Sequence, residues 1–177
     1  MEVADHVILI ANMIFNSKDF KDSLTTLTFK NPENNCSCND QVILHDDVVE
    51  GADAYTLLFK EFNPKLNIKF ARGSRWKGLG VTPICTKDIT SFIKAIQGNM
   101  KDLHNLNPAS VIAVNLCHEY FHSLGYCHTY DKLIENDKRP NGGPINWQYY
   151  RDDITYRIGW IVYDILHRWV VIEKRAI

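Results

Sequence analysis

Apolar residues in the first part of the chain recur at the three- and four-residue intervals of an amphipathic helix. The residues that fall near one face of such a helix are Val7, Ile10, Met13 and Ile14. This spacing predicts an N-terminal helix with an apolar stripe packed on the core. Ser17 is a candidate N-cap for a second helix. The apolar face of that helix consists of Phe20, Leu24 and Leu27.

The rest of the first fifty residues also reads as largely helical. Residues 25–29 leave two interpretations open, because their β-branched side chains suit a strand as well as a helix. Asn39 is a candidate cap for a third helix. That helix is expected to run through Val42 to Glu50 and to be closed by Gly51.

The pattern changes to period two beyond residue 63. Residues 66–70 alternate between apolar and polar side chains, and a second short segment with strand character follows at residues 78–82. Two strands are predicted here.

Two further helices are predicted after these strands. Thr86 is a candidate cap for a short helix. The apolar positions of this helix are Ile89, Phe92, Ile93 and Ile96. Asn107 and Pro108 suit the start of the next helix, because proline is favoured in the first turn. That helix is apolar nearly all round, and it is therefore expected to be buried.

The last part of the chain divides into an irregular segment and a helix. Residues 131–150 contain a run of proline and glycine at 139–144, which predicts irregular structure. Apolar residues then recur at helical spacing. They are Ile154, Ile158, Ile161, Ile165, Trp169 and Ile172. This stripe predicts a C-terminal helix packed on the core.

Composition is that of an ordinary globular domain. The chain has 177 residues, of which 45% are hydrophobic and 23% charged, and this length suffices for one core. Lys and Arg total 20 against 21 for Asp and Glu, so the chain lacks the basic field that nucleic acid or an anionic membrane attracts. A monomer without such partners is expected.

Neither a secretory signal nor a membrane span is evident in the sequence. The early apolar run at residues 7–10 is short and follows acidic rather than basic residues. No segment is long and apolar enough to cross a bilayer. A cytoplasmic location is therefore favoured, while a phage-borne enzyme or a trimmed mature form fits the same observation.

The cysteines are odd in number and cannot all pair with one another. They are Cys36, Cys38, Cys85, Cys117 and Cys127. Reduced thiols are expected, because two of them flank histidines of the motif described next. For Cys36 and Cys38 two interpretations stay open: a thiolate that masks a metal, or a surface loop.

Residues 118–128 read H-E-x-x-H-x-x-G-x-x-H and combine a metal-ligand pattern with a chain reversal. His118 and His122 stand four residues apart, so on a helix they project from one face and can occupy adjacent corners of a metal tetrahedron. Gly125 can end the helix in a left-handed turn, which brings His128 back as a third ligand. Glu119 is then free to act as a general base on a water at the fourth corner.

The longer pattern is far more specific than two histidines and a glutamate alone. At this composition the five fixed residues coincide by chance about once in several tens of thousands of such chains. The remaining histidines lack partners at ligand spacing. They are His6, His45, His104 and His167. A di-iron centre is excluded, because it needs a second Glu-x-x-His motif and the chain has none. Zn²⁺ is the predicted cofactor.

The motif resembles the zinc-binding consensus of the metzincin clan of metalloproteases. A looser similarity over residues 107–159 extends to small bacterial or phage-type zincins. The resemblance implies an α+β, zincin-like fold with a small mixed sheet over a buried active-site helix. It also implies one catalytic domain over residues 1–177, with an upper part at about 1–125 and a lower part at about 126–177. Residues 78–82 become the candidate edge strand that pairs with substrate; an internal strand or a loop is the alternative.

One departure from the clan concerns the methionine turn beneath the metal. The methionines are Met1, Met13 and Met100, all upstream of the motif. Ile154 is the best substitute for the apolar floor. Tyr156 resembles a tyrosine that some metzincins carry, which implies a hydrogen bond to the developing oxyanion or a weak bond to zinc. The alternative is that Tyr156 only packs at the start of the last helix.

The predicted function is that of a zinc-dependent endopeptidase acting on a peptide or protein substrate. Its site residues are His118, His122 and His128 as ligands, with Glu119 and Tyr156 in catalysis. Two alternatives stay open: a zinc-containing binding protein without turnover, and a metal-dependent hydrolase of a non-peptide amide.

Overall fold

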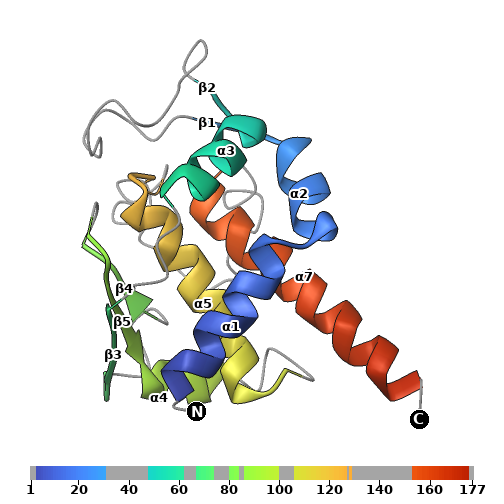
Figure 1. The fold of residues 1–177 in the computed structure, drawn as a ribbon. Coiled ribbons are helices and arrows are strands. Elements are labelled where there is room, and N and C mark those ends of the chain that lie inside the picture. The colour runs from blue at the N-terminus through green and yellow to red at the C-terminus, as the bar shows by residue number, and fades with distance from the viewer. Residues whose placement is uncertain are drawn as a thin grey trace, which may run out of the picture.

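The chain folds as an α+β protein in which helices predominate over two small sheets (Figure 1). The computed structural model describes residues 3–30, 48–61, 67–73, 80–83, 86–99, 106–126, 128 and 153–175. The helices are α1 (Val3–Phe15), α2 (Lys18–Thr25), α3 (Gly51–Glu61), α4 (Ile93–Asn99), α5 (Pro108–Ser123) and α7 (Ile154–Arg175). The strands are β1 (Thr28–Lys30), β2 (Val48–Glu50), β3 (Asn67–Ala71), β4 (Gly80–Val81) and β5 (Asp88–Phe92). The predicted class, α+β with a helix-rich N-terminal part and a C-terminal helix, is confirmed.

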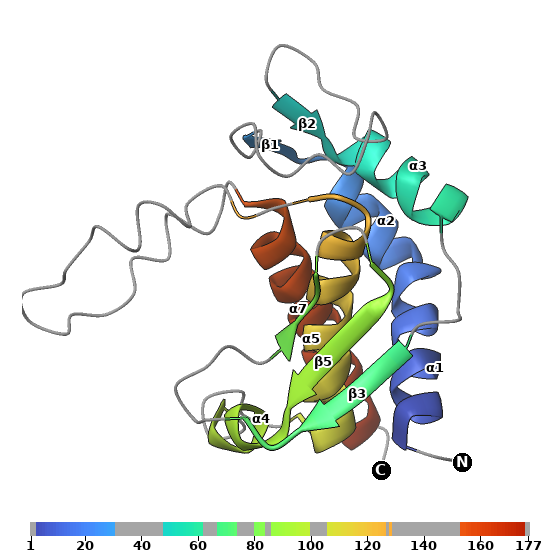
Figure 2. The ribbon, with the colours of Figure 1, turned by 90° about the vertical axis from the view of Figure 1, so that its left-hand side faces the viewer.

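Helix α5 forms the centre of the molecule. In Figures 1 and 2 it runs between the three-stranded sheet on one side and helices α1 and α7 on the other. The Asn107 side chain caps it by accepting a 2.8 Å hydrogen bond from the backbone N–H of Ser110, and Pro108 occupies the first turn. Nearly every residue from Ser110 to His122 is buried. The prediction of a buried helix that starts at Asn107 is therefore confirmed.

The three-stranded sheet has the order β3-β5-β4 and is mixed. Strand β3 pairs with β5 in parallel, while β4 pairs with β5 antiparallel. Both predicted strands are present, and among the described strands β3 and β4 lie at the two edges of the sheet; residues 78 and 79 of the predicted segment lie outside the described part. Strand β4 packs closely on α5, because a Cβ at Gly80 would stand 2.4 Å from Nδ2 of Asn115. Only glycine allows this approach.

The two N-terminal helices follow the predicted caps, with one correction on the buried face. The Ser17 hydroxyl accepts from the backbone N–H of Phe20 at 3.1 Å, which confirms it as the N-cap of α2. Met13 was expected to face the core, but it is 55% exposed. The residues of α1 that are buried are Val7, Ala11, Ile14 and Phe15. Because 3.6 residues form a turn, this set rotates the stripe away from Met13.

The prediction of a helix that closes at Gly51 is wrong for the residues that the structure describes. Residues 48–50 form β2, which pairs antiparallel with β1, and Gly51 begins α3 rather than ending a helix. Its Cβ would lie 2.0 Å from the backbone oxygen of Leu24, so the strand-to-helix junction needs glycine. The proposed start of that helix, from Asn39, lies outside the described residues. Residues 25–29 divide between the end of α2 and β1, so both interpretations hold in part.

The prediction of a helix from Thr86 is also wrong for the first half of that segment. Residues 88–92 form the central strand β5, and the helix starts only at Ile93. Burial alternates along β5, with Ile89 and Ser91 buried, which is the period of a strand. The Thr86 hydroxyl bonds to the backbone oxygen of Pro83 at 2.9 Å and thus belongs to a turn.

Helix α7 carries the predicted apolar stripe. Its buried members are Ile154, Ile158, Ile161 and Ile165, and Trp169 packs partly against the same core. Among the helices that the structure describes, none is long and apolar enough to span a membrane. Cys117 is buried and forms no disulfide. The other four cysteines, like residues 131–150, fall outside the described part of the chain.

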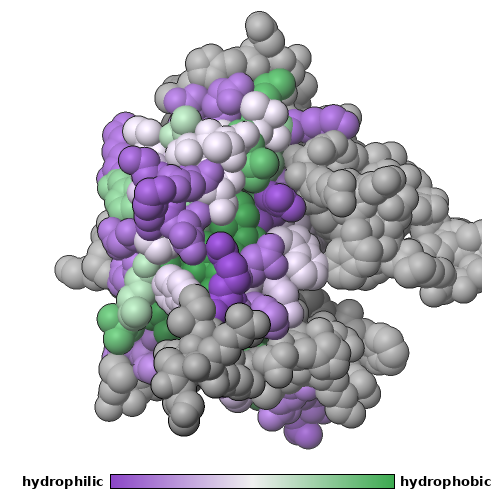
Figure 3. Space-filling model, turned by 90° about the vertical axis from the view of Figure 1, so that its right-hand side faces the viewer, coloured by the Kyte–Doolittle hydropathy of each residue, from purple (hydrophilic) through white to green (hydrophobic). Residues whose placement is uncertain are grey.

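Figure 3 shows the face on which α2 and α7 lie side by side. Hydrophilic residues cover most of its described surface, with apolar atoms between them at its centre. A cavity of about 450 Å³ between the two helices is lined by Ser23, Thr26, Leu27, Arg157, Ile161, Asp164, His167 and Arg168. Arg168 also pairs with Asp19 at 3.4 Å, which ties α7 to α2.

Candidate metal centre

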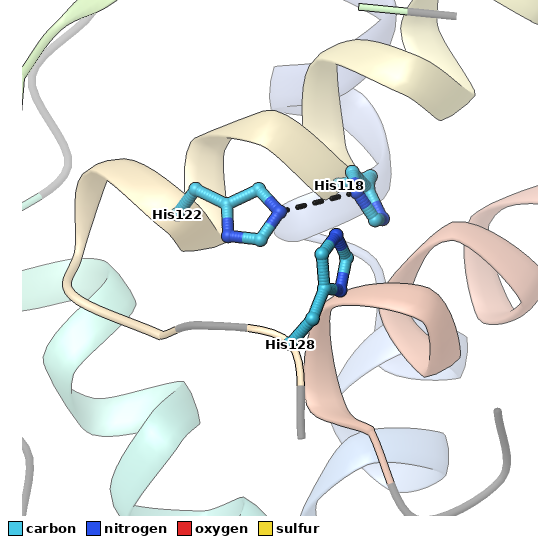
Figure 4. Close-up of side chains that lie close together, drawn as sticks. All are labelled: His118, His122 and His128. Atoms are coloured by element: carbon cyan, nitrogen blue, oxygen red, sulfur yellow. Dashed lines mark hydrogen bonds between the residues drawn. The ribbon is translucent and has the colours of Figure 1, made fainter. Parts of the chain in front are cut away.

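His118 and His122 stand on successive turns of α5 and face one another (Figure 4). Their ring centroids lie 4.9 Å apart, and their Nε2 atoms are separated by 3.3 Å. The predicted spacing of four residues therefore brings both imidazoles to one place, as the geometry of a helix requires.

The chain reverses directly after α5 through a Schellman turn. Gly125 has a φ of 106° and donates its N–H to the backbone oxygen of His122 at 3.0 Å. The N–H of Tyr126 reaches back to the oxygen of Phe121 at 3.1 Å, and the rings of these two residues pack 5.7 Å apart. The reversal predicted at Gly125 is confirmed.

This turn carries His128 back to the other two histidines. Its ring centroid lies 4.5 Å from that of His122 and 5.3 Å from that of His118. One potential ligand atom from each of the three residues lies within 4.8 Å of the others, close enough to hold a metal ion.

Each of the three imidazoles has its Nδ1 engaged by an oxygen atom. Nδ1 of His118 bonds to the backbone oxygen of Thr155 at 2.8 Å, and Nδ1 of His122 to that of Tyr126 at 2.6 Å. Nδ1 of His128 lies 3.1 Å from a carboxylate oxygen of Asp153. Since carbonyl and carboxylate oxygens only accept, these Nδ1 atoms carry protons, and Nε2 is the ring atom through which each histidine would bind a metal ion.

The separation of the two Nε2 atoms on α5 fits a shared zinc ion. With both ring protons on Nδ1, the nitrogens of His118 and His122 direct lone pairs at each other across 3.3 Å. Such a contact is repulsive unless a cation lies between them. Nitrogen ligands about 2.0–2.1 Å from a tetrahedral zinc ion stand about 3.3–3.4 Å apart. The spacing of His118 and His122 is therefore compatible with two ligands of one metal ion.

Burial keeps the imidazoles of His118 and His122 neutral, which is the form that binds a metal. It lowers the pKa of His118 to about 3, and the neighbouring histidines add to this effect. Burial together with His128 lowers the pKa of His122 to about 4. At neutral pH both rings are therefore unprotonated at one nitrogen and available as ligands.

Glu119 lies on the sheet side of α5 and is only 4% exposed. Burial raises the pKa of its carboxyl to about 7, while the backbone N–H and hydroxyl of Thr82, just after β4, act in the opposite direction. The Thr82 hydroxyl lies near Glu119 but does not have the geometry of a hydrogen bond. Among the described residues, Thr82 Oγ1 is a buried polar atom without a hydrogen-bond partner. Glu119 is thus a carboxyl that exchanges a proton near neutrality.

The first turn of α7 forms the floor of the site. Asp153 is fully buried, and its carboxylate accepts from the N–H of Tyr156 at 3.1 Å and from the hydroxyl of Thr155 at 2.8 Å. Burial opposes its ionisation, but the hydrogen bonds from His128, Tyr156 and Thr155 outweigh that effect and lower its pKa. Ile154, the predicted apolar floor, is buried in the core with 1% of its surface exposed.

Tyr156 packs against the site as well as starting a helix. Its ring stacks on His128 with centroids 4.4 Å apart and an interplanar angle of 21°, and it lies 5.1 Å from the ring of His118. The packing interpretation therefore holds, and the position also leaves a catalytic role for the phenol as a prediction.

Sequence reasoning placed the three histidines, Glu119 and Tyr156 in one site, and the structure brings them together. No individual role was predicted from the sequence for Thr82, Asp153 or Thr155. An aspartate directly before a predicted helix is the signal for an N-cap, and this could have identified Asp153 as ordered. Its contact with His128, 25 residues away, has no local signature.

Comparison of the chain with models of protein families, with curated proteins and with solved structures finds no match. The geometry of the site and the motif are therefore the observations that bear on function.

Proposed function

We propose that this protein is a zinc-dependent endopeptidase of the zincin type. The observation that carries the proposal is the meeting of three imidazoles, each with its Nδ1 engaged by an oxygen atom, next to the buried carboxyl of Glu119. His118, His122 and His128 would hold the ion. Three protein ligands leave a tetrahedral ion one open position, which is the arrangement of catalytic rather than structural zinc.

Zinc, when bound, supplies a Lewis acid that polarises a carbonyl group and eases the deprotonation of a water molecule. Glu119 takes the proton from that water as it attacks the scissile carbonyl, and then delivers a proton to the leaving nitrogen. Burial raises the pKa of its carboxyl to about 7 in the metal-free protein, and a bound cation would lower it again, which favours the carboxylate that accepts the proton. Tyr156, whose ring lies beside those of His118 and His128, would donate its hydroxyl to the developing oxyanion.

The edge strand β4 supports a peptide as the substrate. It pairs with β5 on one side, and Thr82 at its end reaches Glu119. An extended peptide can add to the side of β4 that pairs with none of the described strands, through backbone hydrogen bonds next to the Glu119 carboxylate. A compact non-peptide amide would gain nothing from this strand, which favours the peptidase over the general amide hydrolase.

A binding protein with a structural zinc ion is the second candidate. The lack of a methionine after His128 favours it, because the clan's usual floor is missing. The buried Glu119 counts against it, since a carboxyl held in an apolar environment costs stability and a structural site has no use for it.

The proposal is tested by incubating a mixed peptide library with the metal-free protein and with protein reconstituted with one equivalent of zinc. Cleavage at defined bonds only after reconstitution is the expected result, and the fragments give the subsite preferences. Bound zinc without cleavage of any peptide would favour the structural alternative.

A further inference from the structure

Asp153 links the start of a helix to a histidine ligand. One of its carboxylate oxygens, Oδ1, accepts from the N–H of Tyr156 and from the hydroxyl of Thr155, which is the pattern of an N-cap on α7. The other, Oδ2, lies 3.1 Å from Nδ1 of His128. The two halves of one fully buried carboxylate therefore serve two different parts of the molecule.

The hydrogen atoms of this cluster have a self-consistent arrangement. The Thr155 hydroxyl donates to Asp153, so its oxygen is left to accept, and it lies 3.0 Å from Nδ1 of His128. Both neighbours of this nitrogen are then acceptors. Nδ1 of His128 must therefore carry a proton, and Nε2 is the ring atom through which this residue would bind a metal ion.

The backbone of the same turn acts on a second ligand. The carbonyl oxygen of Thr155 accepts from Nδ1 of His118 at 2.8 Å, two residues after the carboxylate that engages His128. The third ligand, His122, is oriented separately by the turn after α5, through Tyr126. Two of the three ligands thus depend on the first turn of α7.

We propose that Asp153 is a positioning residue that fixes the Nδ1-protonated form of His128, and that it thereby makes the capped start of α7 part of the metal centre. This inference rests on the proposed metal site but not on peptide hydrolysis. It explains how a chain without a methionine turn can still orient its histidine ligands. Hydrogen bonds from the start of α7 take the place of the apolar contact that a methionine would make.

The change Asp153→Asn separates the two roles. Asparagine is as good an N-cap as aspartate, and its oxygen can still accept from Tyr156 and Thr155. Its amide then faces Nδ1 of His128 and donates to it, so the ring proton moves to Nε2 and blocks the ligand atom. We expect the metal-free variant to keep its melting temperature within a few degrees and to bind zinc about 10- to 100-fold more weakly.

The most direct readout is the tautomer of His128 in metal-free, ¹⁵N-labelled protein, observed by long-range ¹H–¹⁵N correlation. The wild type should show the proton on Nδ1, and Asp153→Asn should show it on Nε2. Asp19→Asn is the matched control, because Asp19 also lies in the first turn of a helix but pairs with the exposed Arg168. It should leave the tautomer and the zinc affinity unchanged.

Two results would overturn the inference. The first is a wild-type His128 that carries its proton on Nε2, and this holds even if the variant fails to fold. The second is an Asp153→Asn protein with unchanged zinc affinity, which would make Asp153 a helix cap only. Neither result concerns turnover, so a zinc-binding protein that cleaves no peptide would refute the proposed function and leave this inference standing.

Discussion

The ring of Tyr156 lies stacked on the ring of His128, with 4.4 Å between centroids and 21° between planes. The contact joins the first turn of α7 to the last residue of the H-E-x-x-H-x-x-G-x-x-H motif. The stacking holds the phenol ring of Tyr156 beside the ligand cluster.

The stacking contact involves the ring of Tyr156, whereas the proposed catalytic role belongs to its hydroxyl. Tyr156→Phe keeps the ring, so zinc content and melting temperature should stay unchanged. The loss of an oxyanion donor should lower kcat by about 10²- to 10³-fold with little change in KM. Steady-state kinetics on a cleaved peptide test this, and full turnover by the variant would leave Tyr156 a packing role only.

Each of the three histidines should be required for zinc binding. Changing His118, His122 or His128 to alanine removes one of three protein ligands and should abolish stoichiometric zinc, measured as metal content after dialysis against micromolar zinc. His167→Ala is the control, because His167 lies further along α7 and stacks on Tyr163. A variant that retains one zinc per chain would remove the changed residue from the ligand set.

Adding a side chain at Gly125 should disturb the turn that follows α5. The Gly125 φ of 106° is one that L residues rarely adopt, so Gly125→Ala should destabilise the protein by more than about 1 kcal/mol and weaken zinc binding by displacing His128. Gly159→Ala is a matched control within α7. A Cβ there meets its nearest atoms at 3.9 Å, and alanine should stabilise the helix by about 0.5–1 kcal/mol. Urea unfolding of both variants checks the contrast, and equal effects would contradict it.

Burial of Glu119 should appear as a pH-dependent stability of the metal-free protein. Its pKa is raised to about 7 in the fold, so its contribution is fully present below the unfolded value of 4.5 and is lost as pH rises through 7. Glu119→Gln removes this loss. The variant should therefore gain roughly 2 to 3 kcal/mol relative to the wild type between pH 5 and pH 8, because one pKa unit corresponds to 1.36 kcal/mol.

Urea unfolding in the presence of a chelator at the two pH values measures this gain. The histidines are common to both chains, so their own titration cancels in the comparison. A difference between the two proteins that does not change with pH would mean that the carboxyl titrates at its ordinary pKa in the fold.

Local signals predicted the parts of the fold that local interactions determine. The caps at Ser17 and Asn107 and the turn at Gly125 depend on residues within one or two turns of each other, and all three are present. Residues 48–50 and 88–92 were instead expected to be helical. Their β-branched side chains adopt strands because they pair with β1 and with β3 and β4, and those partners are distant in sequence.

The residues of the candidate site also fall into those that a local sequence pattern predicts and those that only tertiary packing brings together. The ligands and Glu119 form a compact motif with a fixed helical spacing, which is why eleven residues could predict them. Asp153 and Thr155 complete the hydrogen bonding of that motif from a separate helix, and Thr82 reaches Glu119 from a separate sheet. Such contacts arise only when tertiary packing brings the elements together, so no spacing along the chain could reveal them.

The central claim is that Glu119 activates water at a zinc centre. The measurement that tests it most directly is the turnover of one cleaved peptide by wild-type and Glu119→Gln proteins at equal, verified zinc content. We expect the variant to keep one zinc per chain and to lose at least about 10²-fold in kcat, because a general base has been removed. Equal turnover by the two zinc-loaded proteins would contradict it.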